Sequence, residues 1–250
     1  FATNKVLSSL LSLLALSNSF MTHMDRCKNQ MLFQKIDESL IETDEHALRF
    51  DGIARLYGEE NFKKLKGSHV AVVGLGGVGS WSAESIARSG VGAITLIDLD
   101  TVCVSNTNRQ MVALGSTVGQ MKAEVMRSRI LDISPKCNVS AILDFVTGEN
   151  CLEILKGKAN ENNSTFDCVI DAIDNIEDKC AIINACRTLN LPVITVGAAG
   201  GRTDPSKVTV SDLTRVDYDE LLSKVRKKLR QNYSFPRGKK EKCKRKEVGR

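Results

Sequence analysis

The chain has 250 residues, of which 42% are hydrophobic and 26% charged, as in ordinary globular domains. Its formal net charge is +5, but residues 237–250 hold eight Lys or Arg and two Glu and so carry +6, which leaves −1 for the rest. These totals exclude a uniformly basic nucleic-acid-binding surface, and no apolar run reaches the roughly 18 residues that a membrane span requires.

The two ends of the chain do not follow the pattern of a folded domain. Residues 1–45 contain an apolar, serine-rich run after Lys5, which is typical of a leader or a disordered N-terminal extension. Residues 237–250 form a basic tail, which we expect to be solvated and which could be a truncated C-terminus. The compartment stays open between the cytoplasm and, if residues 1–45 act as a leader, a mitochondrion or plastid.

Between these ends, helical patterns alternate with short apolar runs. Residues 46–67 predict one or two amphipathic helices. In chain order there follow a strand over 69–75, a helix over 80–90, a strand over 93–100, a helix over 118–133, a strand over 138–145, a helix over 148–157, a strand over 166–174, a helix over 176–190, strands over 192–198 and 207–213, and a helix over 218–231. This alternation predicts an α/β fold: a Rossmann-like, doubly wound, mainly parallel sheet with helices on both faces.

A glycine-rich turn lies between the first strand and the next helix. The segment GLGGVGS contains Gly74, Gly76, Gly77 and Gly79, three of them in G-x-G-x-x-G spacing. Glycines at such a turn let the backbone approach a phosphate at the helix N-terminus. Asp98 ends the second strand, where an acid that binds a ribose is expected. The combination indicates a nucleotide and does not say which one.

Polar residues after the second strand favour a triphosphate over a dinucleotide. Asn106 and Arg109 follow Asp98, and Lys122 lies near the start of its helix, where the macrodipole disfavours a cation unless an anion is near. Arg and Lys are suited to phosphate oxygens. Taken singly, Arg109 could instead form a loop salt bridge, and Lys122 could be an exposed helix lysine.

Asp174 and Asn175 end the fourth strand, at the sheet edge where ligands bind in open α/β folds. A carboxylate there can hold Mg²⁺ between phosphate oxygens. The alternative is that one of the two residues caps the following helix. Asp171, three residues earlier, is either a second polar contact or a buried structural acid.

Together these motifs carry a family resemblance. GLGGVGS, DLD (98–100), SNTNRQ (105–110), Lys122 and IDN (173–175) resemble the ubiquitin-activating, ThiF-type superfamily of adenylating enzymes. The resemblance implies ATP and Mg²⁺ as cofactors and catalytic roles for Arg109, Lys122 and Asp174. The implied roles are ribose binding by Asp98, further nucleotide contacts by Asp100, Asn106 and the glycines, phosphate binding by Arg109 and Lys122, and metal binding by Asp174.

A narrower resemblance covers residues 46–236, the expected adenylation domain. RFDGIARLYG (49–58) and VGAAGGRTDPSKVTVSDL (196–213) resemble the tRNA threonylcarbamoyladenosine dehydratases. This implies tRNA and ATP as substrates, adenylation of a carboxylate followed by cyclising dehydration, and a homodimer. Sulfur-carrier activators have Arg at the position of Gly52; here Arg49 and Arg55 flank it, and either could reach a neighbouring subunit's phosphate.

The chain departs from these families in two further places. The superfamily's D-N-x-x-x-R reads D-N-x-x-x-K here, with Lys179. The dehydratases also continue with a Cys-containing segment, a strand and a helix where this chain has its basic tail. Cys243 lies in that tail without the family's surrounding sequence, so we assign it no catalytic role.

Three other functions stay open on the sequence alone. An activator of a ubiquitin-like or sulfur-carrier protein is disfavoured because no CxxC pair is present. An NAD(P)-dependent oxidoreductase would explain the glycines and Asp98, but not Arg109, Lys122 and Asp174 together. An inactive nucleotide-binding remnant is the last alternative.

Overall fold

The computed structural model of the chain describes residues 45–156 and 166–238. The predicted leader, most of the basic tail and Cys243 lie outside the described residues. The chain divides into two units, Phe1–Arg49 and Phe50–Arg250, and only residues 45–49 of the first are described. In the described ranges no helix has the length and apolar character needed to cross a membrane.

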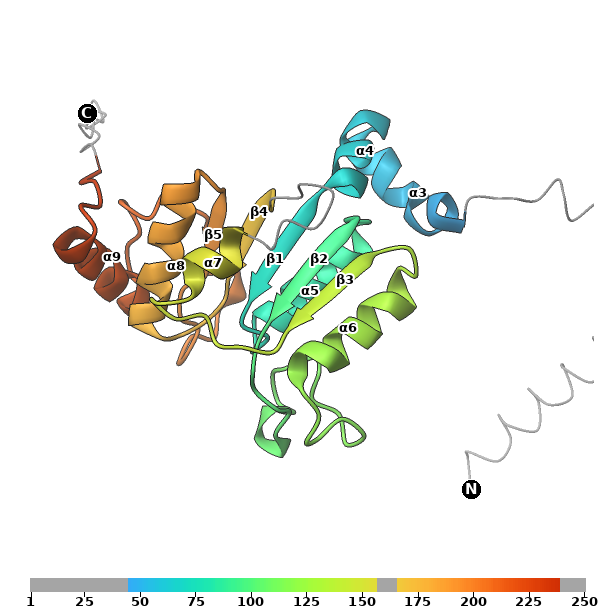
Figure 1. Ribbon diagram of the computed structural model, residues 1–250, viewed down its shortest axis with the longest axis horizontal. Helices are drawn as coiled ribbons and strands as arrows, with labels where there is room; N and C mark the ends of the chain where they lie inside the picture. Colours follow the sequence, from blue (N-terminus) through green and yellow to red (C-terminus); the bar gives the residue numbers. More distant parts are fainter. Residues whose placement is uncertain (1–44, 157–165, 239–250) are drawn as a thin grey trace, which may run out of the picture. The chain divides into compact units, whose positions relative to one another are not determined.

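Five parallel strands form one sheet in the second unit, in the order β3-β2-β1-β4-β5 (Figure 1). The order reverses between β1 and β4, which is the switch point where ligands bind in such sheets. This confirms the predicted doubly wound α/β fold, and each strand ends earlier than predicted. The bounds are β1 (His69–Val73), β2 (Ala93–Ile97), β3 (Asn138–Ile142), β4 (Cys168–Asp171) and β5 (Val193–Thr195).

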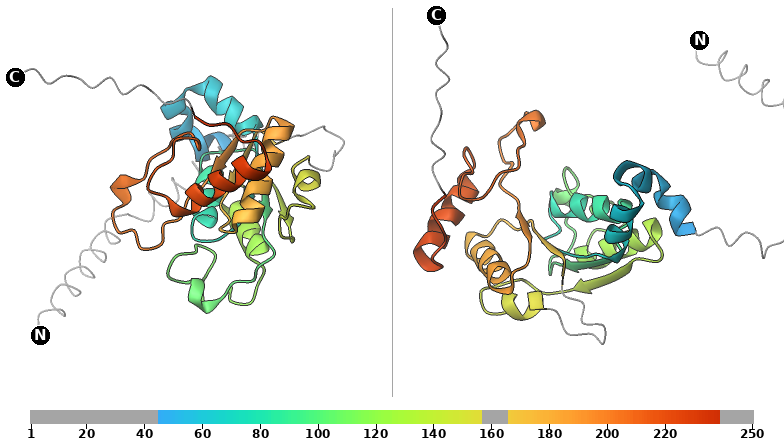
Figure 2. Two further views of the ribbon diagram at one scale, coloured as in Figure 1. Left: turned by 90° about the vertical axis from the view of Figure 1, so that its left-hand side faces the viewer. Right: turned by 90° about the horizontal axis from the view of Figure 1, so that it is seen from above.

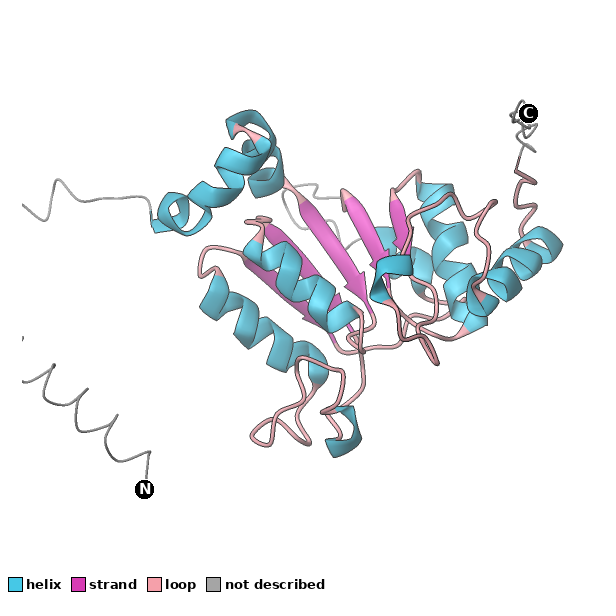
Figure 3. Cartoon of the chain, turned by 180° about the vertical axis from the view of Figure 1, so that it is seen from behind, coloured by secondary structure: helices cyan, strands magenta, loops and turns pink. Residues whose placement is uncertain are grey.

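Alternate residues of the central strand face two separate cores. Val70 and Val72 belong to the core shared with α5 (Gly79–Arg88) and α6 (Lys122–Ile133). Ala71 and Val73 belong to the opposite core, shared with the helices after β3 and β4. Because β1 is buried on both faces, it is a continuous apolar run rather than an alternating one. Figure 3 shows the helices lying along the sheet.

The remaining helices confirm the predicted helical segments. The region ahead of β1 forms two helices that break at Gly58, whose φ of 83° is a conformation that glycine adopts readily. The other helices lie after β3, after β4 and near the end of the described chain. Their bounds are α3 (Glu45–Tyr57), α4 (Glu59–Gly67), α7 (Cys151–Lys156), α8 (Ile176–Leu189) and α9 (Glu220–Asn232).

Helix α9 packs on α8 through an apolar face (Figure 2). Val225 and Leu229 of α9 are fully buried and form one cluster with Cys180 and Ile183 of α8. Asp219 caps α9 by accepting a hydrogen bond from the Leu222 amide. The C-terminal helix is therefore attached to the helix that follows β4.

The predicted strand over 207–213 is wrong. The chain forms a short 3₁₀ turn, η3 (Pro205–Lys207), followed by irregular backbone. Val208 and Val210 alternate with polar residues as in a half-buried strand, but they are 80% and 100% exposed. A strand also needs a neighbour for its backbone hydrogen bonds, and no strand among the described residues pairs with this segment.

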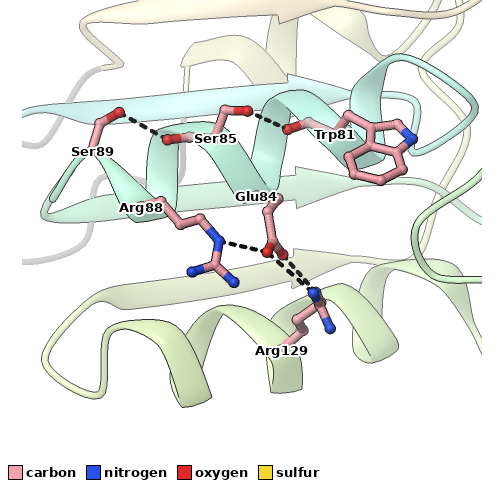
Figure 4. Close-up of polar contacts among 6 residues, drawn as sticks. All are labelled: Trp81, Glu84, Ser85, Arg88, Ser89 and Arg129. Atoms are coloured by element: carbon pink, nitrogen blue, oxygen red, sulfur yellow. Dashed lines mark hydrogen bonds and ion pairs between the residues drawn. The ribbon is translucent and has the colours of Figure 1, made fainter.

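A buried glutamate joins α5 to α6 (Figure 4). The Glu84 carboxylate, only 7% exposed, accepts hydrogen bonds from Arg88 Nε at 2.7 Å and from Arg129 Nε at 2.5 Å and a second Arg129 nitrogen at 3.1 Å. Burial by itself would raise the pKa of this carboxyl, but the hydrogen bonds and charges of Arg129 and Arg88 outweigh it and lower the pKa. Folding therefore favours the ionised form of the Glu84 carboxyl.

The lowered pKa of Glu84 predicts a pH dependence of stability. Because its folded pKa lies below its unfolded value, its contribution is present above the unfolded pKa and is lost as pH falls through the folded pKa. We expect Glu84→Gln to lower the free energy of unfolding by about 1 to 3 kcal/mol at neutral pH, and by less near pH 4. Urea unfolding at both pH values measures this. Glu124→Gln, in the exposed pair with Arg127, is the control and should change little. An equal loss for Glu84→Gln at both pH values would contradict the assignment.

Candidate functional site

The glycine turn (residues 74–79) joins β1 to α5 at the switch point. Gly74 has a φ of 85°, and a Cβ there would lie 2.8 Å from Cγ2 of Ile173. A Cβ on Gly79 would lie 1.8 Å from the Gly74 carbonyl oxygen. Packing therefore requires glycine at both positions. The N-cap residue of α5 is Val78, whose apolar side chain cannot cap the helix, so this N-terminus can accept an anion.

Gly76 and Gly77 have no such packing reason. A Cβ on Gly76 would meet only Nε2 of Gln110, at 4.0 Å, and one on Gly77 would come within 3.4 Å of the Arg109 side chain. Side chains larger than hydrogen could therefore be accommodated by the protein itself. Their absence fits a ligand that approaches the backbone at these two residues.

The difference between these glycines gives a stability prediction. We expect Gly79→Ala to destabilise the chain by at least about 3 kcal/mol, because the new methyl group overlaps a backbone oxygen. Gly76→Ala is the matched control, with an expected loss of about 1 kcal/mol or less. Thermal unfolding followed by circular dichroism measures both. Similar midpoints for the two variants would show that the close approach at Gly79 is not required.

Asp98 connects the glycine turn to the loop after β2. It is 8% exposed, and its carboxylate accepts the Leu75 amide at 2.6 Å and the Asp100 amide at 2.8 Å. These bonds give Asp98 a structural role that the sequence did not predict. Each carboxylate oxygen retains a lone pair, so ribose binding is compatible with this arrangement and stays a prediction.

Lys122 is held by Asp100. It is the first residue of α6 and only 5% exposed, and its Nζ lies 2.8 Å from Oδ2 of Asp100. The Lys122 amide also donates to the Asp100 carbonyl, at 2.9 Å. The position of Lys122 in the sequence predicts a bound phosphate as the neighbouring anion, whereas the structure supplies a protein carboxylate. The alternative of an exposed helix lysine is wrong.

Arg109 lies beside the glycine turn in the loop that follows the 3₁₀ turn η2 (Val104–Asn106). One of its guanidinium nitrogens donates to the Ser105 carbonyl at 3.1 Å and to Oδ1 of Asn108 at 3.0 Å. Within the described ranges it has no carboxylate partner, so the predicted alternative of a loop salt bridge is wrong. Trp81 Nε1 donates to the Arg109 carbonyl at 3.0 Å and fixes this part of the loop.

Asn106 is buried in the same loop. Its side-chain oxygen accepts the Cys103 amide at 3.1 Å, and the residue is 8% exposed. The amide group thus shapes the loop that carries Arg109. A direct contact of Asn106 with ATP stays a prediction.

At the end of β4, Asp174 and Asn175 have different roles. Asn175 caps α8, because its side-chain oxygen accepts the amides of Glu177 at 2.8 Å and Asp178 at 3.2 Å. Asp174 is exposed and makes no hydrogen bond or ion pair with any residue that the structure describes. Of the two predicted roles for this dipeptide, capping therefore falls to Asn175, and Asp174 keeps an unused carboxylate.

A buried ion pair lies beneath the end of β4. The side chains of Asp171 and Lys179 are both fully buried, with Nζ 2.8 Å from Oδ1. The ammonium group also donates to the carbonyls of Asp171 at 3.3 Å and Ile173 at 2.9 Å, and Thr195 donates to the second carboxylate oxygen. Burial raises the pKa of the Asp171 carboxyl, and Lys179 acts against this rise. Asp171 is thus the structural acid rather than a ligand contact.

The two arginines of α3 are each paired within one helical turn. Arg49 lies 2.6 Å from Glu45, and Arg55 pairs with Asp51. Both are predicted nucleotide-binding residues that would act on a neighbouring subunit. Nothing in a single chain tests that role, and it stays a prediction.

Burial makes most of the described cysteines unreactive. It raises the pKa of Cys137 and Cys180 to about 11 and that of Cys186 to about 12. Within the described ranges no group of three or more His, Cys, Asp or Glu side chains could hold a metal ion. The buried thiols therefore pack as small apolar groups.

Contacts connect the predicted site residues around the glycine turn. From the turn, one series runs through Asp98 and Asp100 to the ammonium group of Lys122. On the other side Arg109 lies at the turn itself, and the residues just before Asp174 pack against it. Arg109 and the residues before Asp174 therefore lie at the glycine turn, and Lys122 is connected to it through Asp100. A shared contact of Arg109, Lys122 and Asp174 with one triphosphate stays a prediction.

Comparisons with known proteins identify the family. A model of the ThiF family matches residues 51–245. The tRNA threonylcarbamoyladenosine dehydratase of Haemophilus influenzae is 45% identical over 199 residues, which are 80% of this chain and 74% of that protein. Crystal structures of the E. coli tRNA N6-threonylcarbamoyladenosine dehydratase in complex with ATP and with AMP share 45% sequence identity with this chain. Their TM-scores are 0.73 and 0.72, and each match covers 78% of this chain and 77% or 76% of the E. coli chain. The chain therefore belongs to the ThiF family and, within it, to the tRNA threonylcarbamoyladenosine dehydratases.

Proposed function

We propose that this chain is an ATP-dependent dehydratase of N6-threonylcarbamoyladenosine in tRNA, which activates the threonylcarbamoyl carboxylate by adenylation. The observation that carries the proposal is the series of contacts that joins Lys122, Arg109 and the residues before Asp174 to one glycine turn. An NAD(P)-dependent oxidoreductase would use the turn and Asp98, but it has no need of two cations and a free acid there.

The cyclising dehydration takes place in two steps. A carboxylate oxygen of the threonylcarbamoyl group attacks the α-phosphorus of ATP, and the bond to the β-phosphate oxygen breaks to release pyrophosphate. The ureido group then attacks the activated acyl carbon, closes the ring, loses a proton and expels AMP. The oxygen lost from the nucleoside leaves on AMP, so the net change is loss of one water at the expense of ATP.

The cations act on charge that grows in the first step. Arg109 offers a fork of N–H donors, and the loop contacts of its guanidinium leave other donors unused. Lys122 is already placed and desolvated by its ion pair with Asp100, so little reorganisation is required when phosphate charge develops near it.

Magnesium fits the carboxylate of Asp174. No three-residue metal cluster exists among the described residues, and Mg²⁺ commonly uses one or two carboxylates together with substrate phosphates. When bound, the ion would neutralise phosphate charge between ATP and Asp174. Asp174 is exposed and has no protein partner in the described ranges, as this role requires.

The metal assignment predicts a selective loss in Asp174→Asn. We expect this variant to bind Mn²⁺ in the presence of ATP at least about tenfold more weakly, while its thermal midpoint stays unchanged, because an exposed group is replaced. Electron paramagnetic resonance of free Mn²⁺ measures binding without turnover. The control is Asp178→Asn, four residues further on. If Mn²⁺ binds both variants equally well, Asp174 is not the metal ligand.

A homodimer is part of this proposal. In the dimer, Arg49 or Arg55 would release its carboxylate partner in the same helix and contact the phosphates of ATP bound to the other subunit. Sedimentation should give a dimer, and mixing an Arg55→Ala chain with an Arg109→Ala chain should restore activity if Arg55 serves the partner. Failure of the mixture, together with full activity of both Arg49→Ala and Arg55→Ala, would remove this role.

The function itself is tested on modified tRNA. We expect incubation with ATP and Mg²⁺ to convert the nucleoside to a product lighter by one water, with one AMP and one pyrophosphate formed per product. A heavy-oxygen label in the substrate carboxylate should appear in AMP. Unchanged nucleoside, or a label that stays out of AMP, would reject the proposal. Thermal shifts with ATP·Mg²⁺ and with NAD⁺ separate nucleotide classes, and only the former should stabilise the chain.

A further inference from the structure

The outer face of α9 carries a cationic cavity that the adenylation site does not use. Its lining, which we call the α9 cavity, consists of Ser223, Arg226, Lys227, Arg230, Gln231 and Arg237. Ser223, Lys227 and Arg230 recur at helical spacing, opposite the apolar face that packs on α8. Four of the six lining residues are cations, and none is an acid.

No described acid neutralises the exposed charges of the α9 cavity. Lys227, Arg230 and Arg237 have no carboxylate partner within the described ranges. On α8, Glu177 forms an ion pair with α9, but its partner is Lys228, which does not line the cavity. Such a concentration of like charge is unfavourable unless an anion binds.

Two arginines show that the cavity is built rather than accidental. A guanidinium nitrogen of Arg226 donates to the carbonyls of Leu213 at 3.2 Å and Val216 at 2.5 Å, which fixes one wall. Nε of Arg230 is buried and has no hydrogen-bond partner among the residues that the structure describes. A buried charged donor without a hydrogen bond is unfavourable, and an anionic oxygen bound to this nitrogen would supply the missing bond.

We propose that the α9 cavity binds the phosphate backbone of the tRNA substrate, an inference that rests on the proposed function. Ser223 to Arg230 spans about 10 Å along the helix, longer than one phosphate group. Arg and Lys side chains with neutral hydrogen-bonding neighbours are the groups that contact phosphates and sugars without reading bases. In the sequence, Arg237 is followed by further Lys and Arg residues.

The position of α9 connects this contact to the reacting centre. α9 packs on α8, and α8 begins two residues after Asp174. RNA held on α9 would thus be joined to the helix that begins just after Asp174, the predicted metal ligand. Because the cavity touches none of the nucleotide-binding residues, its loss should change tRNA affinity and leave ATP affinity unchanged.

The test compares two sets of variants in the full chain. The first is Lys227→Ala with Arg237→Ala, and the control is Lys224→Ala with Lys136→Ala, which removes the same charge from exposed residues outside the cavity. Filter binding of an unmodified tRNA transcript at several salt concentrations is measured, with ATP affinity measured in parallel. We expect about tenfold weaker tRNA binding for the first set and a salt slope shallower by about 1 to 2, since each phosphate contact contributes about 0.7 to 0.9.

The outcomes separate this inference from the proposed function. A higher KM for modified tRNA at unchanged kcat in the cavity variant supports the inference. If the wild-type chain dehydrates the tRNA, and the cavity and control variants have the same KM and salt slope, the inference is overturned and the proposed function is retained. tRNA binding that depends on the cavity without any dehydration would reject the function alone. Competition by inorganic phosphate as strong as by tRNA would show a small-anion site and overturn the inference.

Discussion

Arg109→Ala and Lys122→Ala are each expected to slow adenylation at least about 100-fold while the fold stays intact. Both cations serve charge that develops as pyrophosphate leaves, and removing one such group costs roughly that factor. Arg109 is exposed and has no carboxylate partner in the described ranges, so its loss leaves no buried charge. Asp100, the partner of Lys122, has a side chain that is 54% exposed and can be solvated when the ammonium group is gone.

The measurement is ATP consumption with modified tRNA, under saturating substrates, together with thermal unfolding of each variant. Arg127→Ala is the matched control, because Arg127 is a half-exposed arginine on α6 whose partners in the described part of the chain are Glu124 and a backbone carbonyl. Lys122→Met keeps the apolar stem of the side chain and should be as slow as Lys122→Ala. Rates within about threefold of wild type in the Arg109 or Lys122 variants would remove these residues from the catalytic step.

Lys179→Met is expected to lower the free energy of unfolding by about 3 to 5 kcal/mol, the largest stability effect among the ion pairs described. The Lys179 ammonium has three acceptors at 3.3 Å or less, and both it and Asp171 are fully buried. Methionine fills a similar volume, so the loss measures the unpaired Asp171 carboxylate rather than a cavity. Urea unfolding at neutral pH gives the value.

Two further variants and a change of pH identify the cause. Without Lys179, the folded pKa of Asp171 lies further above its unfolded value, so folded stability falls as pH rises and the deficit should shrink in acid. Adding Asp171→Asn to Lys179→Met should recover more than about 1 kcal/mol, since the buried charge is gone. Lys179→Arg tests whether the superfamily's residue can serve the same acceptors. A deficit below about 1 kcal/mol in Lys179→Met would show that the pair is not required.

The two central strands β1 and β2 were predictable because each is a short apolar run that the fold buries almost completely. β1 illustrates this, since its continuous apolar sequence faces two cores. In the segment 207–213 apolar and polar residues alternate clearly, yet the segment forms no strand. A local pattern says which residues could face a core, but the pairing partner comes from elsewhere in the chain.

The site was predictable in its residue types and less so in its contacts. Glycine spacing and an acid after β2 are local signals, so the turn and Asp98 were found directly. The partners of Lys122 and Lys179 were not, because Asp100 and Asp171 reach them only after α6 and α8 pack back onto the sheet. The D-N-x-x-x-K motif was noticed as a departure from the superfamily, and spacing alone did not show that its lysine would bind Asp171.

The most direct test is a crystal structure of this chain with a non-hydrolysable ATP analogue and Mn²⁺. We predict that the anomalous signal places Mn²⁺ within bonding distance of the Asp174 carboxylate and of a phosphate oxygen. Arg109 and Lys122 should donate hydrogen bonds to the same triphosphate. A nucleotide bound away from the glycine turn, or one that leaves any of these three side chains without a contact to its phosphates or metal, would contradict the account.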